Sequence, residues 1–256
     1  MHVTPFKGVC AIYFVSTLAM RHPPDDPASS YEIGVDESGR GSIISAVVAG
    51  AVVMPPLSMF SGDEPMMAQY LAIKDSKKLT PSKREKLADF IQQHAVAWGV
   101  GVIDEAEIDK INILNATYKA MHSAISQCLD KLDCKNTPTQ PRGVKLLIDG
   151  NRFKPYVRNE SQNAAIIPYE CIVKGDDKEV CIAAGSILAK TYHDKIIRDL
   201  VASDPDTYAK YDLIKNMGYA TAKHIDAIKK NGLSAAHRKS YVLKSLTPPD
   251  VPDVPT

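Results

Sequence analysis

The chain has 256 residues, of which 45% are hydrophobic, and a formal net charge of +1. A chain of this length and composition can bury one substantial core and carry a small appendage. The near-zero charge excludes an overall basic field, so a polyanionic partner would require a local basic patch.

The cysteines predict a reducing compartment. They are odd in number and form no CxxC pair, which argues against a disulfide framework and against structural zinc. We therefore expect a cytoplasmic protein. The five are Cys10, Cys128, Cys134, Cys171 and Cys181.

The first 30 residues are expected to be a disordered extension. Lys7 precedes an apolar run at 8–20 that has the length of a signal peptide but lacks the usual small-residue cleavage site. This run is too short to span a bilayer as a helix, which leaves secretion as a minor alternative and Met20 as a candidate initiator. Proline, aspartate and serine enrich residues 21–30, so we expect the folded core to begin near Tyr31.

Three apolar strands are expected in the first half of the core. The first begins at Tyr31, the second spans 45–54 and the third spans 96–103. A helix starting at Pro81 separates the second strand from the third. The short or non-crossover links suggest an antiparallel meander.

Helices and strands alternate further along the chain. Helical spacing runs through 108–132 and 182–201, and apolar strands are expected at 144–149 and 170–173. Strands separated by helices imply parallel pairing through crossover connections.

Short helices and basic side chains follow the last long helix. They predict a small helical appendage at 204–247 that packs on the core. The proline-rich tail at 248–256 has nothing to pack and is expected to be disordered.

Acidic residues stand at the ends of three expected strands. Asp36 and Glu37 end the first strand, Asp149 ends the fourth, and Asp176 follows the fifth. Taken alone, each stretch is also typical of a solvated turn. Open sheets bind ligands at the carboxyl ends of their parallel strands, so one fold could bring the four acids together. Since neighbouring strand residues point to opposite faces, Asp36 and Glu37 can share a site only if the backbone bends there.

Four clustered carboxylates would repel one another unless a cation compensates their charge. Oxygen-only ligation selects magnesium or manganese, because neither cysteine nor histidine recurs at suitable places. Two such ions roughly 3.5 to 4 Å apart can activate a water and stabilise the leaving oxygen of a phosphodiester. The acids therefore predict metal-dependent phosphodiester chemistry.

Short motifs occur in a fixed order between Tyr31 and about Leu246. They are DESGRG at 36–41, DSKKL at 75–79, INILNA at 111–116, DG at 149–150, KGD at 174–176, SILAK at 186–190, GYAT at 218–221 and HRKSY at 237–241. One such motif is weak, but the ordered set is specific. It resembles bacterial-type ribonuclease HII.

The resemblance implies an α/β, RNase H-like core at 31–203. Its five-stranded mixed sheet has three antiparallel strands followed by two parallel ones, is flanked by helices, and carries a C-terminal helical segment that binds substrate. The implied enzyme is an endonuclease that hydrolyses RNA in RNA–DNA hybrids and cuts 5′ of single ribonucleotides embedded in duplex DNA. It would leave 3′-hydroxyl and 5′-phosphate ends, and would remove misincorporated ribonucleotides and RNA primers.

The resemblance also implies roles for the four acids. Asp36 would bridge both metal ions, which would be Mg²⁺ or Mn²⁺. Glu37 and Asp149 would complete the metal site on the leaving-group side, and Asp176 the site of the attacking water. Gly185 stands where the family usually has alanine or serine, and this departure removes no metal ligand.

Substrate contacts follow from the same resemblance. The Gly39-Arg40-Gly41 loop would sense the ribose 2′-hydroxyl at a junction of RNA with DNA, and glycine lets backbone groups approach it closely. Lys77 matches a phosphate-contacting lysine. Tyr219 matches the tyrosine that stacks on the deoxyribose after the ribonucleotide.

Two other functions stay open. Another nuclease or strand-transfer enzyme of the same superfamily would share the acids without requiring a 2′-hydroxyl. A hybrid-binding protein without catalysis could be held by Arg40, Lys77 and the basic C-terminal segment, although a pure binder gains nothing from acids beside phosphate. Neither tail shows a clamp-docking motif and no apolar stripe signals a dimer, so we expect a monomer away from membranes.

Overall fold

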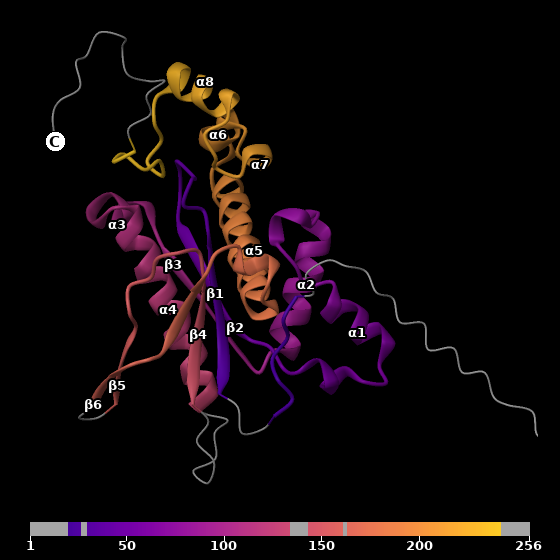
Figure 1. Ribbon diagram of the computed structural model, residues 1–256. Helices are drawn as coiled ribbons and strands as arrows, with labels where there is room; N and C mark the ends of the chain where they lie inside the picture. Colours follow the sequence, from indigo (N-terminus) through magenta and orange to yellow (C-terminus); the bar gives the residue numbers. More distant parts are fainter. Residues whose placement is uncertain (1–19, 27–29, 134–142, 161–162, 242–256) are drawn as a thin grey trace, which may run out of the picture.

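A computed structural model describes residues 20–26, 30–133, 143–160 and 163–241 of the chain, and its centre is a five-stranded mixed sheet (Figure 1). The strand order is β3-β2-β1-β4-β7, in which β1, β2 and β3 pair antiparallel while β4 and β7 run parallel to β1. This arrangement confirms the predicted fold. The strands are β1 (Tyr31–Ser38), β2 (Val47–Val53), β3 (Ala97–Ile103), β4 (Val144–Asp149) and β7 (Tyr169–Ile172).

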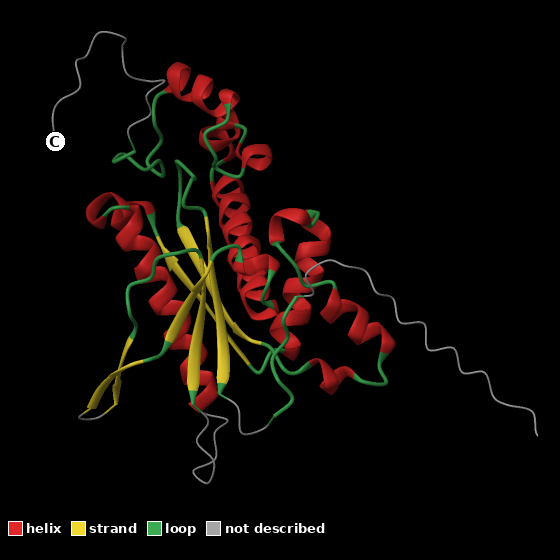
Figure 2. Cartoon of the chain, viewed as in Figure 1, coloured by secondary structure: helices red, strands yellow, loops and turns green. Residues whose placement is uncertain are grey.

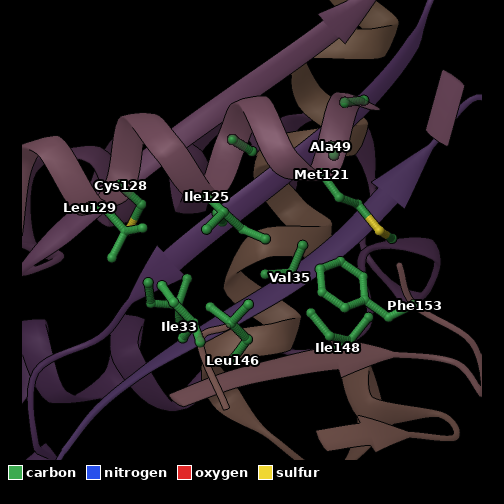
Figure 3. Packing of buried hydrophobic residues seen from close by; sticks show 14 of the residues in the cluster. Ile33, Val35, Ala49, Met121, Ile125, Cys128, Leu129, Leu146, Ile148 and Phe153 are labelled. Atoms are coloured by element: carbon green, nitrogen blue, oxygen red, sulfur yellow. The ribbon is translucent and has the colours of Figure 1, made fainter. Parts of the chain in front are cut away.

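Helices cover both faces of the sheet (Figure 2). Helix α4 (Ile113–Asp133) packs on one face, where its apolar stripe meets the inward side chains of β1 and β4 (Figure 3). Helix α5 (Val180–Ser203) packs on the other face, together with α1 (Glu64–Leu71) and α2 (Pro81–His94). None of the described helices combines the length and apolar composition that crossing a membrane requires.

The expected helix at 108–132 is two helices. Helix α3 (Glu105–Ile111) ends before Asn112, whose backbone is left-handed with φ +66°, and α4 begins at Ile113. The side-chain oxygen of Asn112 accepts a hydrogen bond from the Asn115 amide at 3.1 Å and so caps α4. Asparagine tolerates this backbone and caps helices well, which explains the break within an apolar pattern.

A small hairpin between β4 and β7 was not predicted. It consists of β5 (Val157–Glu160) and β6 (Asn163–Ile166), paired antiparallel. Val157 and Ile166 are exposed, so these strands lack the one-sided apolar alternation from which strands are recognised.

The prediction of disorder before Tyr31 is wrong for residues 20–26. Arg21 forms a parallel bridge beside Glu179, with its amide donating to the Lys178 carbonyl at 2.7 Å. The Arg21 guanidinium pairs with Glu32 on β1 and with Glu179 at the start of α5, at 2.9 and 2.8 Å. The candidate initiator Met20 packs against the α5-side core, whereas residues 1–19 lie outside the described part of the chain.

The C-terminal segment consists of short helices, as predicted. It forms its own apolar cluster with Ile43, Ile44 and Ile197, so it packs on the loop after β1 and on the far end of α5. Residues 242–256, including the expected tail, lie outside the described residues. The elements are α6 (Pro205–Tyr208), η4 (Ala209–Tyr211), α7 (Leu213–Asn216) and α8 (Ala222–Asn231), and the core adds η1 (Leu57–Phe60), η2 (Ser76–Lys78) and η3 (Gly175–Asp177).

Helix α5 approaches the sheet backbone unusually closely. A Cβ atom added at Gly185 would lie 3.0 Å from the Gly50 carbonyl oxygen and 3.1 Å from that of Gly34, and at Gly34 it would lie 2.0 Å from the Cys181 carbonyl carbon. Glycine at these positions therefore lets the helix and the strands touch through their backbones. The contact brings Ser186 against the end of β1.

Candidate active site

Strand β1 continues in regular pairing through its two acids. Asp36 pairs with Gly50 and Glu37 with Ala49 on β2, and the left-handed turn comes only at Gly39, where φ is +88°. The expected bend at the two acids is therefore wrong. The parallel register pairs Val35 with Ile148, so Asp36 lies level with Asp149, the last residue of β4, and Glu37 extends past the end of that strand.

Asp36 is the most buried of the four acids. Its carboxylate accepts hydrogen bonds from the Glu37 amide at 2.7 Å and from the Ser186 hydroxyl on α5. Burial raises its pKa well above the usual range, and the charges of Glu37 and Asp149 raise it further. The neighbouring carboxylates therefore act directly on this group.

Glu37 points toward the α4 side of the sheet, where it lines a hollow of about 440 Å³ with Asp149. Its carboxylate receives Arg40 Nη1 at 3.1 Å. Burial raises the pKa of Glu37 and the charge of Asp149 adds to the rise, while Arg40 opposes it.

Asp149 and Asp176 meet through the turn after β7. The Gly175 amide donates to Asp149 Oδ1 at 2.7 Å, which places Asp176 directly beside this carboxylate. Burial and then the charge of Asp149 raise the pKa of Asp176 to about 6. The structure thus brings all four predicted acids to one edge of the sheet.

The four acids supply only oxygen donors, and burial with neighbouring negative charge raises the pKa of Asp36, Glu37 and Asp176. Magnesium or manganese suits such a donor set. Among the described residues, no three acidic, histidine or cysteine side chains already surround a point that an ion could occupy. Asp36, Glu37 and Asp149 each accept a hydrogen bond from a protein donor. The four acids therefore fit a metal site in which a bound ion would bring their carboxylates closer together.

The predicted substrate residues surround a second hollow of about 460 Å³ next to the acids. It is lined by Gly39, Arg40 and Gly41 after β1, by Lys77, and by Tyr219. Burial alone would lower the pKa of Lys77, but the charges of Asp36 and Asp176 outweigh it and raise the pKa. Lys77 therefore keeps its positive charge beside the acids.

The C-terminal segment holds the Gly39-Arg40-Gly41 loop. Arg238 is 2% exposed and donates to the carbonyls of Ser45, Ala46 and Arg40 at 2.8, 2.9 and 3.2 Å. The Tyr241 hydroxyl donates to the same Arg40 carbonyl at 2.7 Å. These bonds leave Arg238 no role at the surface, so this family-like residue is structural.

His224 and His237 are structural for the same reason. Their Nε2 atoms are 3.1 Å apart in a buried contact, and Ser234 engages the Nδ1 of His237. Burial lowers the pKa of both rings, with His237 reaching about 4.

Sequence reasoning did not assign a role to two serines beneath the acids. Ser186 reaches Asp36, and its hydroxyl lies 2.9 Å from that of Ser76 in a buried contact. Asp194 on α5 receives Arg84 Nη2 and Lys190 Nζ, each at 2.7 Å. Ser76 and Ser186 stand within DSKKL and SILAK, and this is the only signal that could have singled them out.

Comparison with known proteins decides between the families that carry such an edge. The family model for Ribonuclease HII matches residues 33–244. A protein named Ribonuclease HII from Parabacteroides distasonis is 41% identical over 212 residues, which are 83% of this chain and 90% of that protein. The chain belongs to the ribonuclease HII family. It is therefore an RNase H-type endonuclease acting on RNA paired with DNA.

Solved structures share the fold of this ribonuclease HII family member. Ribonuclease H2 from Pyrococcus horikoshii superposes with a TM-score of 0.57 at 22% identity, covering 82% of this chain and 93% of that one. Bst-RNase HIII in complex with Mn²⁺ superposes with a TM-score of 0.53 at 20% identity, covering 80% and 64%.

Proposed function

We propose that this enzyme incises duplex DNA on the 5′ side of a single embedded ribonucleotide, and hydrolyses RNA in longer hybrids, with two Mg²⁺ or Mn²⁺ ions. The convergence of the four acids beside the Gly39-Arg40-Gly41 loop and Tyr219 carries the proposal. The same edge of the sheet then provides a site for the cations and a site for the ribose that is recognised.

Asp36, Glu37, Asp149 and Asp176 would hold the ions. Bound divalent cations activate a water and stabilise the leaving oxygen of the phosphodiester. Support comes from the raised pKa values of Asp36, Glu37 and Asp176, and from the solved RNase HIII complex, which contains Mn²⁺. Loading with cations would relieve the repulsion that burial intensifies.

The remaining side chains position the substrate. Lys77 carries a positive charge beside the acids and can bind a phosphate oxygen. Gly41 lines the hollow without a side chain, so a ribose 2′-hydroxyl can approach the backbone of the loop. Tyr219 offers a ring on which the next deoxyribose stacks, and a ribose at that position would clash.

The products would have 3′-hydroxyl and 5′-phosphate ends. Such cleavage suits the removal of misincorporated ribonucleotides and of RNA primers during replication. We propose that the enzyme does this as a cytoplasmic monomer.

A labelled duplex with one ribonucleotide, incubated with magnesium or manganese, tests the proposal. We expect one cut on the 5′ side of the ribonucleotide and no cut in an all-DNA duplex of the same sequence. Intact substrate under both metals, with folded protein, contradicts the proposal. Equal cleavage of the all-DNA duplex favours a nuclease that ignores the 2′-hydroxyl.

A further inference from the structure

Two hollows flank the acidic edge, one on each side. We name them the tyrosine hollow, of about 460 Å³, which includes Lys77 and Tyr219, and the α4 hollow, of about 440 Å³, which includes Asp149 and Arg152. Glu37 and Arg40 line both. A polynucleotide that passes over the acids therefore has a place to lie on either side of them.

The α4 hollow continues into a third one along the same helix. This outer hollow, of about 490 Å³, is lined by Ile111, Asn115, Tyr118, Lys119, His122 and Lys154, and Tyr118 also lines the α4 hollow. Its lining contains no acidic residue. The charge of the surface thus changes from negative to positive with distance from the acids.

Two cations along these hollows, Arg152 in the α4 hollow and Lys154 in the outer hollow, are not neutralised by neighbours. Arg152 and Lys154 are exposed, and within the described ranges no carboxylate forms an ion pair with either. Lys119, in contrast, pairs with Glu107 at 2.7 Å. Unpaired cations at the mouths of adjoining hollows suit the phosphates of a nucleic-acid backbone.

The segment that carries these two cations is held rigidly. Phe153, between them, is buried, and Figure 3 shows its ring beside Ile148 and Met121. The ring also meets His122 edge-on, with centroids 5.5 Å apart, and His122 Nε2 donates to the Lys154 carbonyl at 2.7 Å. A buried anchor between two exposed cations presents both at fixed positions, which lowers the entropy lost on binding.

We propose that Arg152 and Lys154 bind phosphates of the cleaved strand on the 5′ side of the scissile bond. This rests on the proposed function, because the assignment of Tyr219 to the nucleotide after the ribonucleotide sets the direction of the strand. With that nucleotide in the tyrosine hollow, the strand reaches the α4 hollow in the 5′ direction. The ligand is the phosphodiester backbone, so the contact is independent of base sequence.

The double variant Arg152→Ala/Lys154→Ala tests this on duplexes that carry one ribonucleotide. Binding is measured by fluorescence anisotropy in EDTA, and cleavage in magnesium. On a duplex with a long 5′ flank, we expect Kd to rise about 10-fold, the salt slope of binding to fall by roughly 1 to 2, and kcat to stay unchanged. On a duplex whose cleaved strand keeps only two nucleotides 5′ of the ribonucleotide, variant and wild type should bind equally.

The matched control is Lys195→Ala, which removes an exposed lysine of α5 that lines none of the three hollows and pairs with Asp199 at 2.5 Å. It should bind both duplexes as the wild type does. An equal loss on both duplexes, or a loss that disappears only when the complementary strand is trimmed, overturns the proposal. A wild type that binds but forms no product in magnesium refutes the proposed function instead, because the binding assay involves no cleavage.

Discussion

Asp36, which accepts a hydrogen bond from α5, and Asp194, which lies on α5, are both buried carboxylates, yet their surroundings differ in charge. Asp194 is 3% exposed and is matched by Arg84 and Lys190. Burial alone would raise its pKa, but hydrogen bonds from His193 and Lys190, with the charges of Lys190 and Arg84, lower it. Asp36 is 6% exposed and faces further acids, so its pKa is raised. A buried carboxylate whose charge is balanced by neighbouring cations of the same chain is structural. A buried carboxylate that faces other acids is a candidate for binding a ligand.

The largest expected effect comes from Asp36→Asn. We expect cleavage to fall by about 10³-fold or more, because one charge is lost from a site that functions through charge balance. The unfolding free energy should stay constant or rise, since a repelled charge is removed while the amide oxygen still accepts from Ser186. Cleavage assays and urea denaturation measure the two effects. A cleavage rate within 10-fold of the wild type would contradict the functional role of Asp36 and, with it, the contrast with Asp194.

The opposite pattern is expected for Asp194→Asn. It leaves the buried Arg84 without its carboxylate, and breaking such a pair costs about 3–5 kcal/mol of unfolding free energy. Urea denaturation measures the loss. Asp199→Asn, which removes an exposed partner of Lys195, is the control and should change stability little. If the two variants lose equal stability, Asp194 is not the structural acid described above.

Divalent cations should stabilise the wild type but not Asp36→Asn. Binding to the folded state alone adds roughly 2.7 kcal/mol at 100 times Kd. The pKa of Asp176 rises from 3.8 to about 6, so the metal-free folded state binds more protons than the unfolded chain between these pH values. Its stability therefore falls as the pH rises through this window, and the gain from magnesium grows. Thermal unfolding at pH 4.5 and 7.5, with magnesium and with EDTA, measures both trends, and an equal magnesium shift at the two pH values would contradict them.

The smallest effects are expected from the two buried serines, and Ser186→Ala has the larger of them. This variant removes the hydroxyl that lowers the pKa of Asp36. A hydrogen bond to a charged group contributes roughly 1.5 kcal/mol, so cleavage should fall about 10-fold. Ser76→Ala, which removes only the second hydroxyl, should have a weaker effect. Steady-state cleavage rates measure both, and the reverse order would separate Ser186 from Asp36.

The sequence predicted the sheet and its acidic edge well, for physical reasons. Apolar runs specify buried strands, and an acid at the end of such a run is an uncommon use of charge that recurs at Asp36, Asp149 and Asp176. The bend at Asp36 and Glu37 was wrongly predicted because strand alternation treats one strand by itself. It omits the pairing with β4, whose register brings Asp36 level with Asp149 and lets Glu37 extend past the end of that strand.

Contacts between segments that are distant in the chain could not be predicted from the sequence. Nothing local to Arg21 indicates Glu179, and nothing local to Arg238 indicates the carbonyl of Arg40, since each depends on how the elements pack. The break at Asn112 was missed because the apolar spacing continues on both sides of it. The β5–β6 hairpin was missed because Val157 and Ile166, at the outer ends of its strands, are exposed to solvent.

The bonds from Arg238 to the loop after β1 also set an order of events during synthesis. Every acid of the edge has been made once residue 176 is joined to the chain, but the guanidinium that fixes the Arg40 carbonyl comes more than 60 residues later. Since domains begin to fold from the amino terminus as the ribosome extends them, the edge can assemble before the loop is fixed. The acids and the contact that fixes the loop, which we propose to sense the 2′-hydroxyl, are thus completed at different points of synthesis.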